Sequence, residues 1–187
     1  PISAIYPINE LITALLLLIG FLKLGISIKF LIFCIIAPTL LTISIIDIKH
    51  KIIPDIITIP GILFGLIAGS YLVGLKDSSL GLIVGGSTFL IISEIYYRIR
   101  GRVGMGGGDI KFIAAAGALL GIQQVILIIF ISSFMGSFVG LAGLAGKKFN
   151  ALSQIPFGPF LSGGTLIVYF WGEQIIQIYI MNITGRY

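Results

Sequence analysis

Two aspartates in this sequence border long apolar segments, where a carboxylate is unusual. Asp47 ends one such segment at its polar boundary, and Asp109 precedes another. A carboxylate in a membrane span costs roughly 2.5–3.5 kcal/mol, so it is a functional candidate by default. Two carboxyls a few Å apart share one proton: one acts as a base on water and the other as an acid toward a scissile carbonyl. Asp47 and Asp109 are therefore a candidate catalytic pair for peptide hydrolysis.

A run of three glycines, Gly106, Gly107 and Gly108, directly precedes Asp109. Glycines leave room for an extended peptide to approach, and their N–H groups could bind substrate carbonyls. An ordinary alternative is a flexible loop in which Asp109 serves as a helix N-cap. The spacing alone leaves both interpretations open.

The composition indicates a membrane protein. The chain has 187 residues, of which 57% are hydrophobic and 10% charged, and its mean hydropathy is +1.14. Soluble domains usually carry about 25% charged residues. We therefore expect one compact membrane domain over residues 1–187. The net charge of +5 comes from cations between apolar segments, which favours the lipid bilayer over nucleic acid as a partner.

The apolar segments predict an all-α, polytopic membrane bundle of about seven transmembrane helices. The fifth is short and follows the glycine run, so we expect it to start inside the membrane. Glycine pairs at 81 and 85 and at 136 and 140 have the small-xxx-small spacing that lets membrane helices approach closely. The expected spans are 8–24, 28–46, 56–75, 80–97, 110–121, 125–145 and 160–180.

Lysine and arginine favour the cytoplasmic side of a membrane. Taken alternately, the loops on one side hold Lys49, Lys51, Arg98, Arg100, Arg102, Lys111, Lys147 and Lys148, and those on the other hold Lys23, Lys29, Lys76 and Arg186. The richer side is predicted to be cytoplasmic, which places both aspartates at the same depth on that face.

Four blocks in order resemble the prepilin peptidases, the type IV leader peptidases, which are membrane aspartyl proteases of the GxGD class. The blocks are YPINEL at 6–11, DIKHKIIPD at 47–55 continued by TIP at 58–60, GGGDIK at 106–111, and IPFGPFL at 155–161. They extend over almost the whole chain. Each block is moderately specific, and their order makes the resemblance strong.

The resemblance implies that Asp47 and Asp109 are the catalytic pair. It implies cleavage of a short basic leader from a type IV prepilin or pseudopilin precursor, at the cytoplasmic face of the bacterial inner membrane. That hydrolysis needs no metal and no cofactor. Type IV pilus assembly, type II secretion and competence all stay open as the pathway.

Full-length bacterial members carry, before the YPxxEL block, a first span and a cytoplasmic domain with two Cys-x-x-Cys pairs. Here the chain begins at Pro1 and its single cysteine is Cys34. The start is consistent with truncation or proteolysis. Many members also methylate the new N-terminus with S-adenosylmethionine, an activity that the resemblance implies only for a full-length protein.

Four further charged residues are candidate substrate-binding or supporting groups. Asp55 either caps the third span or contacts the basic leader, and Lys111 could stabilise a nearby anion. Glu10 and Glu94 lie near cytoplasmic span ends. They would pair with neighbouring cations, including Arg98, or recognise leader cations.

Two other classes of protein are alternatives to the peptidase. A small proton- or cation-coupled transporter could also use Asp47 and Asp109, because intramembrane acids and glycine-broken helices suit transport. The sequence has no evident inverted repeat, and both acids are predicted at one face rather than at the midplane. A purely structural membrane subunit would not explain the paired acids.

Overall fold

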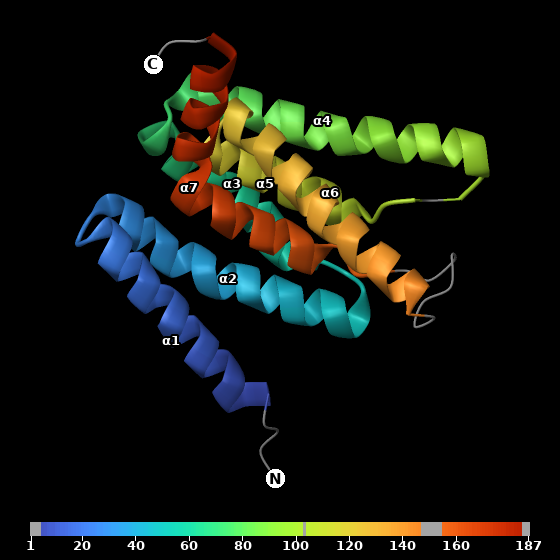
Figure 1. Ribbon diagram of the computed structural model, residues 1–187, viewed down its shortest axis with the longest axis horizontal. Coiled ribbons are helices and arrows are strands. Elements are labelled where there is room, and N and C mark those ends of the chain that lie inside the picture. The colour runs from blue at the N-terminus through green and yellow to red at the C-terminus, as the bar shows by residue number, and fades with distance from the viewer. Residues whose placement is uncertain (1–4, 103, 147–154, 185–187) are drawn as a thin grey trace.

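The computed structural model describes residues 5–102, 104–146 and 155–184, and over these ranges it is a helical bundle without strands (Figure 1). The all-α architecture predicted from the sequence is confirmed. The seven helices are α1 (Ile5–Leu24), α2 (Ile28–His50), α3 (Asp55–Leu72), α4 (Leu75–Arg100), α5 (Gly107–Leu120), α6 (Ile122–Ala145) and α7 (Gly158–Thr184).

Five of these helices, α1 to α4 and α6, are long and apolar enough to cross a membrane. The fifth helix, α5, has 14 residues, which at about 1.5 Å per residue gives roughly 21 Å. This length is less than the thickness of the hydrocarbon core of a bilayer, about 30 Å. The helix is therefore short, as predicted for the fifth span. The chain is thus a multi-pass membrane protein.

Several predicted span boundaries differ from the observed helix ends. The second helix does not stop at residue 46 but continues to His50, and Lys51 then ends it in the left-handed region at φ 55°. Asp47 is therefore part of the last turn of α2. Leu75 starts α4 instead of ending the third span, because Gly74 at φ 90° turns the chain between α3 and α4.

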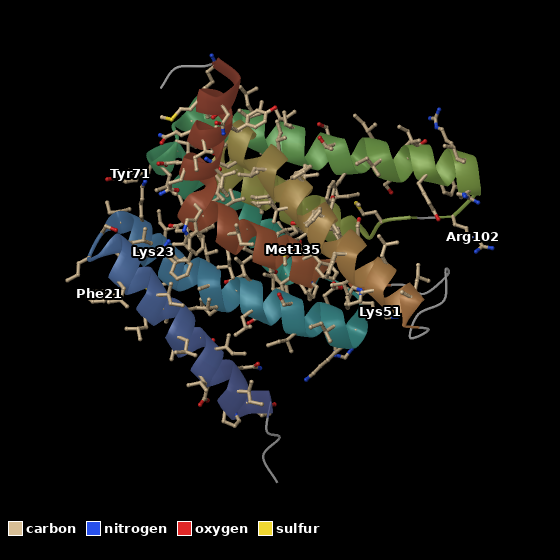
Figure 2. All side chains as sticks on the ribbon, in the orientation of Figure 1. Phe21, Lys23, Lys51, Tyr71, Arg102 and Met135 are labelled. Atoms are coloured by element: carbon tan, nitrogen blue, oxygen red, sulfur yellow. The ribbon has the colours of Figure 1, made fainter. Side chains whose placement is uncertain are left out.

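The helix ends alternate between two ends of the bundle. The end of α2 and the starts of α3, α5 and α7 lie at one end, on the right of Figure 1. Figure 2 shows Lys51 and Arg102 at this end, and Lys23 and Tyr71 at the opposite end. The described cations therefore gather at the ends that the alternating loops predict, whereas Lys147, Lys148 and Arg186 lie outside the described residues.

Glycines let α5 sit at the centre of one layer, between α3 and α4. Gly81 of α4 meets Gly117 of α5 backbone to backbone, and a Cβ at Gly85 would lie 2.7 Å from the Ile113 carbonyl oxygen. On the other side, a Cβ at Gly65 of α3 would lie 2.7 Å from the Ala115 carbonyl oxygen. The predicted packing role of the 81 and 85 pair is confirmed.

The second predicted glycine pair faces the segment that leads into α7. A Cβ at Gly136 would lie 3.2 Å from the Phe157 ring, and one at Gly140 would lie 3.5 Å from Ile155 Cδ1. This contact places the start of α7 against α6.

A second layer is formed by α2 and α7, with α1 packed on α2 (Figure 1). The rings of Phe33 on α2 and Phe170 on α7 pack at an interplanar angle of 59°, with centroids 4.8 Å apart. The Tyr169 hydroxyl donates to the Lys29 carbonyl oxygen at 2.6 Å. Because α2 packs on α7 and α1, it makes few contacts with α3, the next helix in the chain.

Candidate active site

Asp47 is buried in the last turn of α2, with 4% of the residue exposed. Its Oδ2 accepts a hydrogen bond of 2.7 Å from the backbone N–H of Gly158. Gly158 is the first residue of α7, and helix N-termini present free N–H groups and a partial positive charge to anions. The positive end of α7 thus opposes the negative end of α2 at this carboxyl.

Only glycine fits at position 158. A Cβ there would lie 2.8 Å from Asp47 Oδ2 and 3.0 Å from Asp47 Cβ. In the sequence, Gly158 stands within the 155–161 block, where the resemblance indicates no role for it. A signal was available, since Pro159 in the first turn marks a helix start whose N–H groups need partners.

Asp109 is the third residue of α5, whose N-cap position is held by Gly106. The Asp109 N–H donates to the Gly106 carbonyl oxygen at 3.1 Å, and the Gly106 backbone hydrogen-bonds the Asp109 carboxyl. The proposed N-cap role of Asp109 was therefore misplaced. An acidic residue at the third helical position reaches back to the cap, as in half of a capping box.

Asp47 and Asp109 come from two helix ends that are distant in sequence. Asp47 acts electrostatically on the half-buried Asp109 carboxyl. Both residues lie at the end of the bundle where α2 ends and α5 begins (Figure 1). A neighbouring negative charge disfavours ionisation of the Asp109 carboxyl.

The three glycines before Asp109 have different surroundings. A Cβ at Gly108 would lie 2.6 Å from the Ile53 carbonyl oxygen, so this glycine permits close packing of the 51–54 loop. Gly107 is exposed, and a Cβ there would meet nothing within 4 Å. Open space for an approaching peptide is thus present at Gly107, whereas Gly108 is occupied by the chain itself.

Asp55 and Lys111 form an ion pair beside the two aspartates. Lys111 Nζ lies 2.7 Å from Asp55 Oδ1 and 2.6 Å from Oδ2. Asp55 is the first residue of α3, and Pro54 holds the cap position. The pair therefore links the start of α3 to the start of α5, and both side chains remain partly exposed.

Glu94 and Glu10 are not joined to this cluster. Glu94 Oε1 pairs with Arg98 Nε at 2.7 Å on the exposed surface of α4, which confirms the expected pairing for Glu94. Glu10 is exposed on α1, and no ion pair with it occurs among the described residues. Nor do those residues contain a group of three or more His, Cys, Asp or Glu side chains able to hold a metal ion.

Asp47 and Asp109 both lie in a region that matches a known protein family. The model of the type IV leader peptidase family matches residues 34–141, a stretch that contains both Asp47 and Asp109. The chain belongs to the type IV leader peptidase family. The family match runs from within α2 to within α6, so it covers the short helix α5 and the loops at both aspartates.

Curated relatives are similar to this chain over nearly its whole length. Proteins named prepilin leader peptidase/N-methyltransferase are 32% identical over 182 residues in Xanthomonas campestris pv. campestris, 34% over 189 in Aeromonas hydrophila and 35% over 182 in Legionella pneumophila. The alignments cover 96%, 97% and 96% of this chain, but 63% of each relative. The chain thus spans less than two thirds of their length. No solved structure matches it.

Proposed function

We propose that this chain is an aspartic endopeptidase that removes the short basic leader from type IV prepilin or pseudopilin precursors at the cytoplasmic face of the inner membrane. The observation that carries the proposal is the position of Asp47 and Asp109 on two helix ends at the same end of the bundle, where the charge of Asp47 acts on Asp109. The family match and the names of the relatives support the reaction and the class of substrate. The cations gathered at this end of the bundle support the cytoplasmic assignment.

The proposed mechanism uses one proton shared by the two carboxyls. The ionised carboxylate takes a proton from a water molecule, whose oxygen attacks the scissile carbonyl carbon, while the protonated carboxyl donates to the carbonyl oxygen. Collapse of the tetrahedral intermediate breaks the C–N bond, and a proton passes to the leaving amine. The Gly158 N–H holds Asp47 in a fixed orientation during these steps.

The remaining candidate residues have supporting roles in the proposal. The exposed backbone at Gly106 and Gly107 offers an extended peptide an open approach to Asp109. Asp55, the first residue of α3, could receive a leader cation in exchange for Lys111. Glu10 and Glu94 would act at a distance, on exposed surfaces of α1 and α4.

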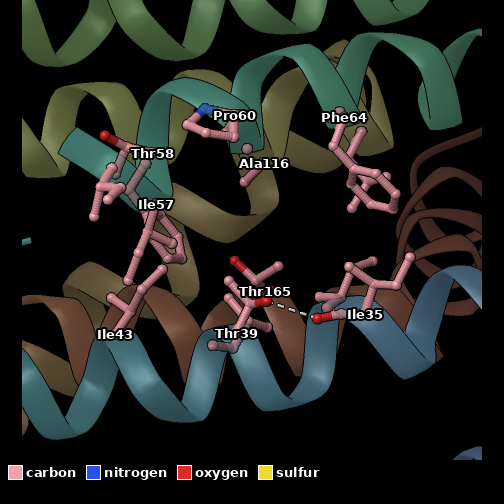
Figure 3. Close-up of a pocket in the computed structure, with 17 residues that line it drawn as sticks. Ile35, Thr39, Ile43, Ile57, Thr58, Pro60, Phe64, Ala116 and Thr165 are labelled. Atoms are coloured by element: carbon pink, nitrogen blue, oxygen red, sulfur yellow. Dashed lines mark hydrogen bonds between the residues drawn. The ribbon is translucent and has the colours of Figure 1, made fainter. Parts of the chain in front are cut away.

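Methyl transfer is proposed only for the longer proteins of the family. The names of the relatives include N-methyltransferase, which implies S-adenosylmethionine as methyl donor. The apolar hollow between α2 and α3 is lined by no carboxylate that could bind a sulfonium ion (Figure 3). We therefore derive no methyl-transfer step from these residues.

Cleavage of a pilin-like precursor by the purified chain in detergent tests the proposal. We would compare the wild type with Asp47→Asn and Asp109→Asn, and use Asp77→Asn as a matched control, because Asp77 is exposed at the start of α4. Product from the wild type and the control, and none from either active-site variant, supports the peptidase. Undiminished cleavage by one variant removes that residue from the mechanism, and failure of the wild type to cleave refutes the proposal.

A further inference from the structure

A polar hollow lies at the end of the bundle opposite to the two aspartates, between the turn that joins α1 to α2 and one side of α7. Its volume is about 280 Å³, close to the lower end of the range of about 300–1,000 Å³ typical of ligand sites. Its lining includes Lys23, Lys29 and Glu173, with the rings of Tyr169 and Phe170. Figure 2 shows Lys23 at this end of the molecule.

The polar hollow lies at the depth of lipid headgroups. From Lys29 to Asp47, α2 rises about 27 Å at roughly 1.5 Å per residue. This distance is close to the thickness of the hydrocarbon core of a bilayer, about 30 Å. With Asp47 at one membrane surface, Lys29 therefore lies at the other. Trp171, which contacts Lys23, is an amphipathic residue of the kind that is enriched at membrane interfaces.

Lys23, in the last turn of α1, directs its ammonium group toward aromatic rings of α7. Its Nζ lies 3.5 Å from the centroid of the Trp171 ring and 5.6 Å from that of the Phe170 ring. Among the residues that the structure describes, no carboxylate lies within ion-pair distance of Lys23. The rings attract the cation but do not neutralise it, so its charge remains available to an anion.

The ion pair between Lys29 and Glu173 is open. Lys29 Nζ and Glu173 Oε1 are 3.8 Å apart, beyond the range of about 2.7–3.2 Å for an N–H···O hydrogen bond. The pairs made by Arg98 and Lys111 are closed, at 2.7 and 2.6 Å. The Lys29 and Glu173 side chains are 56% and 74% exposed. Each therefore keeps its hydrogen-bonding capacity for an oppositely charged group of a ligand.

The walls of the polar hollow are held together by contacts that do not use its charged groups. The Tyr169 hydroxyl donates to the backbone carbonyl oxygen of Lys29 at 2.6 Å, which leaves the Lys29 ammonium group outside this bond. The Phe33 and Phe170 rings pack with centroids 4.8 Å apart. A ligand would therefore meet a site that is already formed.

The charges of the polar hollow match those of a zwitterionic phosphate ester. The ammonium group of lysine is a common ligand for phosphate, and a carboxylate accepts hydrogen bonds from a primary ammonium group. Phosphoethanolamine carries both complementary groups, a phosphate anion for Lys23 and Lys29 and an ammonium group for Glu173. A phosphoglycerol group has no cation for Glu173, and the quaternary ammonium of phosphocholine has no N–H to donate.

Apolar side chains beside the polar hollow favour a lipid over a soluble phosphate ester. Leu22, next to Lys23 in α1, is 73% exposed, and Ile28, next to Lys29 in α2, is 46% exposed. Acyl chains would cover such side chains in the bilayer, whereas a soluble ester would leave them uncovered.

We propose that the polar hollow binds the phosphoethanolamine headgroup of a membrane lipid, with the phosphate at Lys23 and Lys29 and the ammonium group at Glu173. The site lies at the far end of the bundle from Asp47 and Asp109. The proposal therefore goes beyond the peptidase activity and does not depend on it.

The fluorescence of Trp171 tests the proposal, because Trp171 is the one tryptophan of the chain and contacts Lys23. The purified chain is placed in phosphatidylcholine nanodiscs with increasing fractions of a lipid brominated in its upper acyl chain, which quenches tryptophan on contact. We expect phosphatidylethanolamine to reach half-maximal quenching at a mole fraction about tenfold lower than phosphatidylglycerol or phosphatidylcholine, the ratio that one hydrogen bond between charged groups gives. Equal fractions for the three lipids, or a lower one for phosphatidylglycerol, would overturn the proposal without any variant.

Variants of the exposed charged groups assign the preference to the polar hollow. Glu173→Gln should quench equally with phosphatidylethanolamine and phosphatidylglycerol, and Lys29→Gln should lose saturable quenching. Asp77→Asn and Lys76→Gln are the matched controls, because both residues are exposed at the start of α4 and neither lines the polar hollow. An unchanged preference in Glu173→Gln would overturn the role of the carboxylate.

A soluble competitor distinguishes a lipid from a free phosphate ester. An excess of glycerophosphoethanolamine should leave the quenching by brominated phosphatidylethanolamine unchanged, because the soluble ester has no acyl chains to bury. Relief of quenching by this compound would assign the polar hollow to a soluble ligand and overturn the lipid proposal. None of these measurements involves cleavage, so their outcome is independent of the test of the peptidase.

Discussion

The backbone N–H of Gly158 donates a hydrogen bond of 2.7 Å to Asp47 Oδ2 across 111 residues of sequence. The bond joins the last turn of α2 to the first residue of α7. It fixes the direction of a buried carboxylate with a backbone group, which has no rotamers to lose. The family block at 155–161 therefore has a structural explanation in the orientation of Asp47.

Gly158→Ala should reduce precursor cleavage sharply. The new Cβ would lie 2.8 Å from Asp47 Oδ2, so the carboxylate must move. A misplacement of about 1 Å can cost about 10²-fold in rate, and we expect a loss of that order in kcat. The measurement is steady-state cleavage in detergent.

Gly163→Ala on the same helix is the control for that substitution. Its Cβ would meet only the flexible side chain of Met135, with Cε at 3.4 Å and Sδ at 4.0 Å. We expect wild-type cleavage from this variant. Wild-type kcat in Gly158→Ala would show that the hydrogen bond to Asp47 has no part in the reaction.

Gly108→Ala and Gly107→Ala should differ in stability although they are neighbours. The Cβ at 108 would lie 2.6 Å from the Ile53 carbonyl oxygen, whereas the Cβ at 107 meets nothing within 4 Å. Overpacking against backbone costs typically about 1–3 kcal/mol. Thermal unfolding in detergent should show a lower midpoint for Gly108→Ala alone, and equal midpoints would contradict the described packing of the 51–54 loop.

Gly81→Ala should destabilise the layer formed by α3, α4 and α5. Its Cβ would overlap the carbonyl group of Gly117, which belongs to the backbone and cannot rotate away. We expect a loss of about 1–3 kcal/mol in the free energy of unfolding, measured by denaturation in detergent. Gly140→Ala, which has ordinary contact distances, should be close to wild type. A wild-type value for Gly81→Ala would argue against the close crossing of α4 and α5.

The ion pair between Asp55 and Lys111 should contribute little to stability. Both side chains are more than a third exposed, at 57% and 38%, and exposed pairs typically give about 0.2–1 kcal/mol. A double-mutant cycle with Asp55→Asn and Lys111→Gln should return a coupling energy in this range that shrinks at high salt. A larger, salt-independent coupling energy would mean that the pair is shielded from solvent.

The sequence predicted the local features of the candidate site because they depend on short-range chemistry. Apolar segments long enough for lipid predicted the helices, and the cations between them predicted the two ends of the bundle. The glycine run before Asp109 predicted a short helix with an open approach. The predicted helix boundaries were wrong where a helix end tolerates polar residues. For this reason α2 extends past Asp47 to His50.

Only the tertiary structure decided which groups meet, because such contacts depend on how helices far apart in sequence pack. It brought Gly158 to Asp47, paired Asp55 with Lys111 and left Glu10 apart. Because α2 packs on α1 and α7, it has few contacts with α3, and a groove lies between α2 and α3. No periodicity in the sequence predicts this groove. The sequence by itself identified the two candidate carboxylates and predicted the membrane-spanning helices that carry them. Helix packing determined their partners and the space beside them.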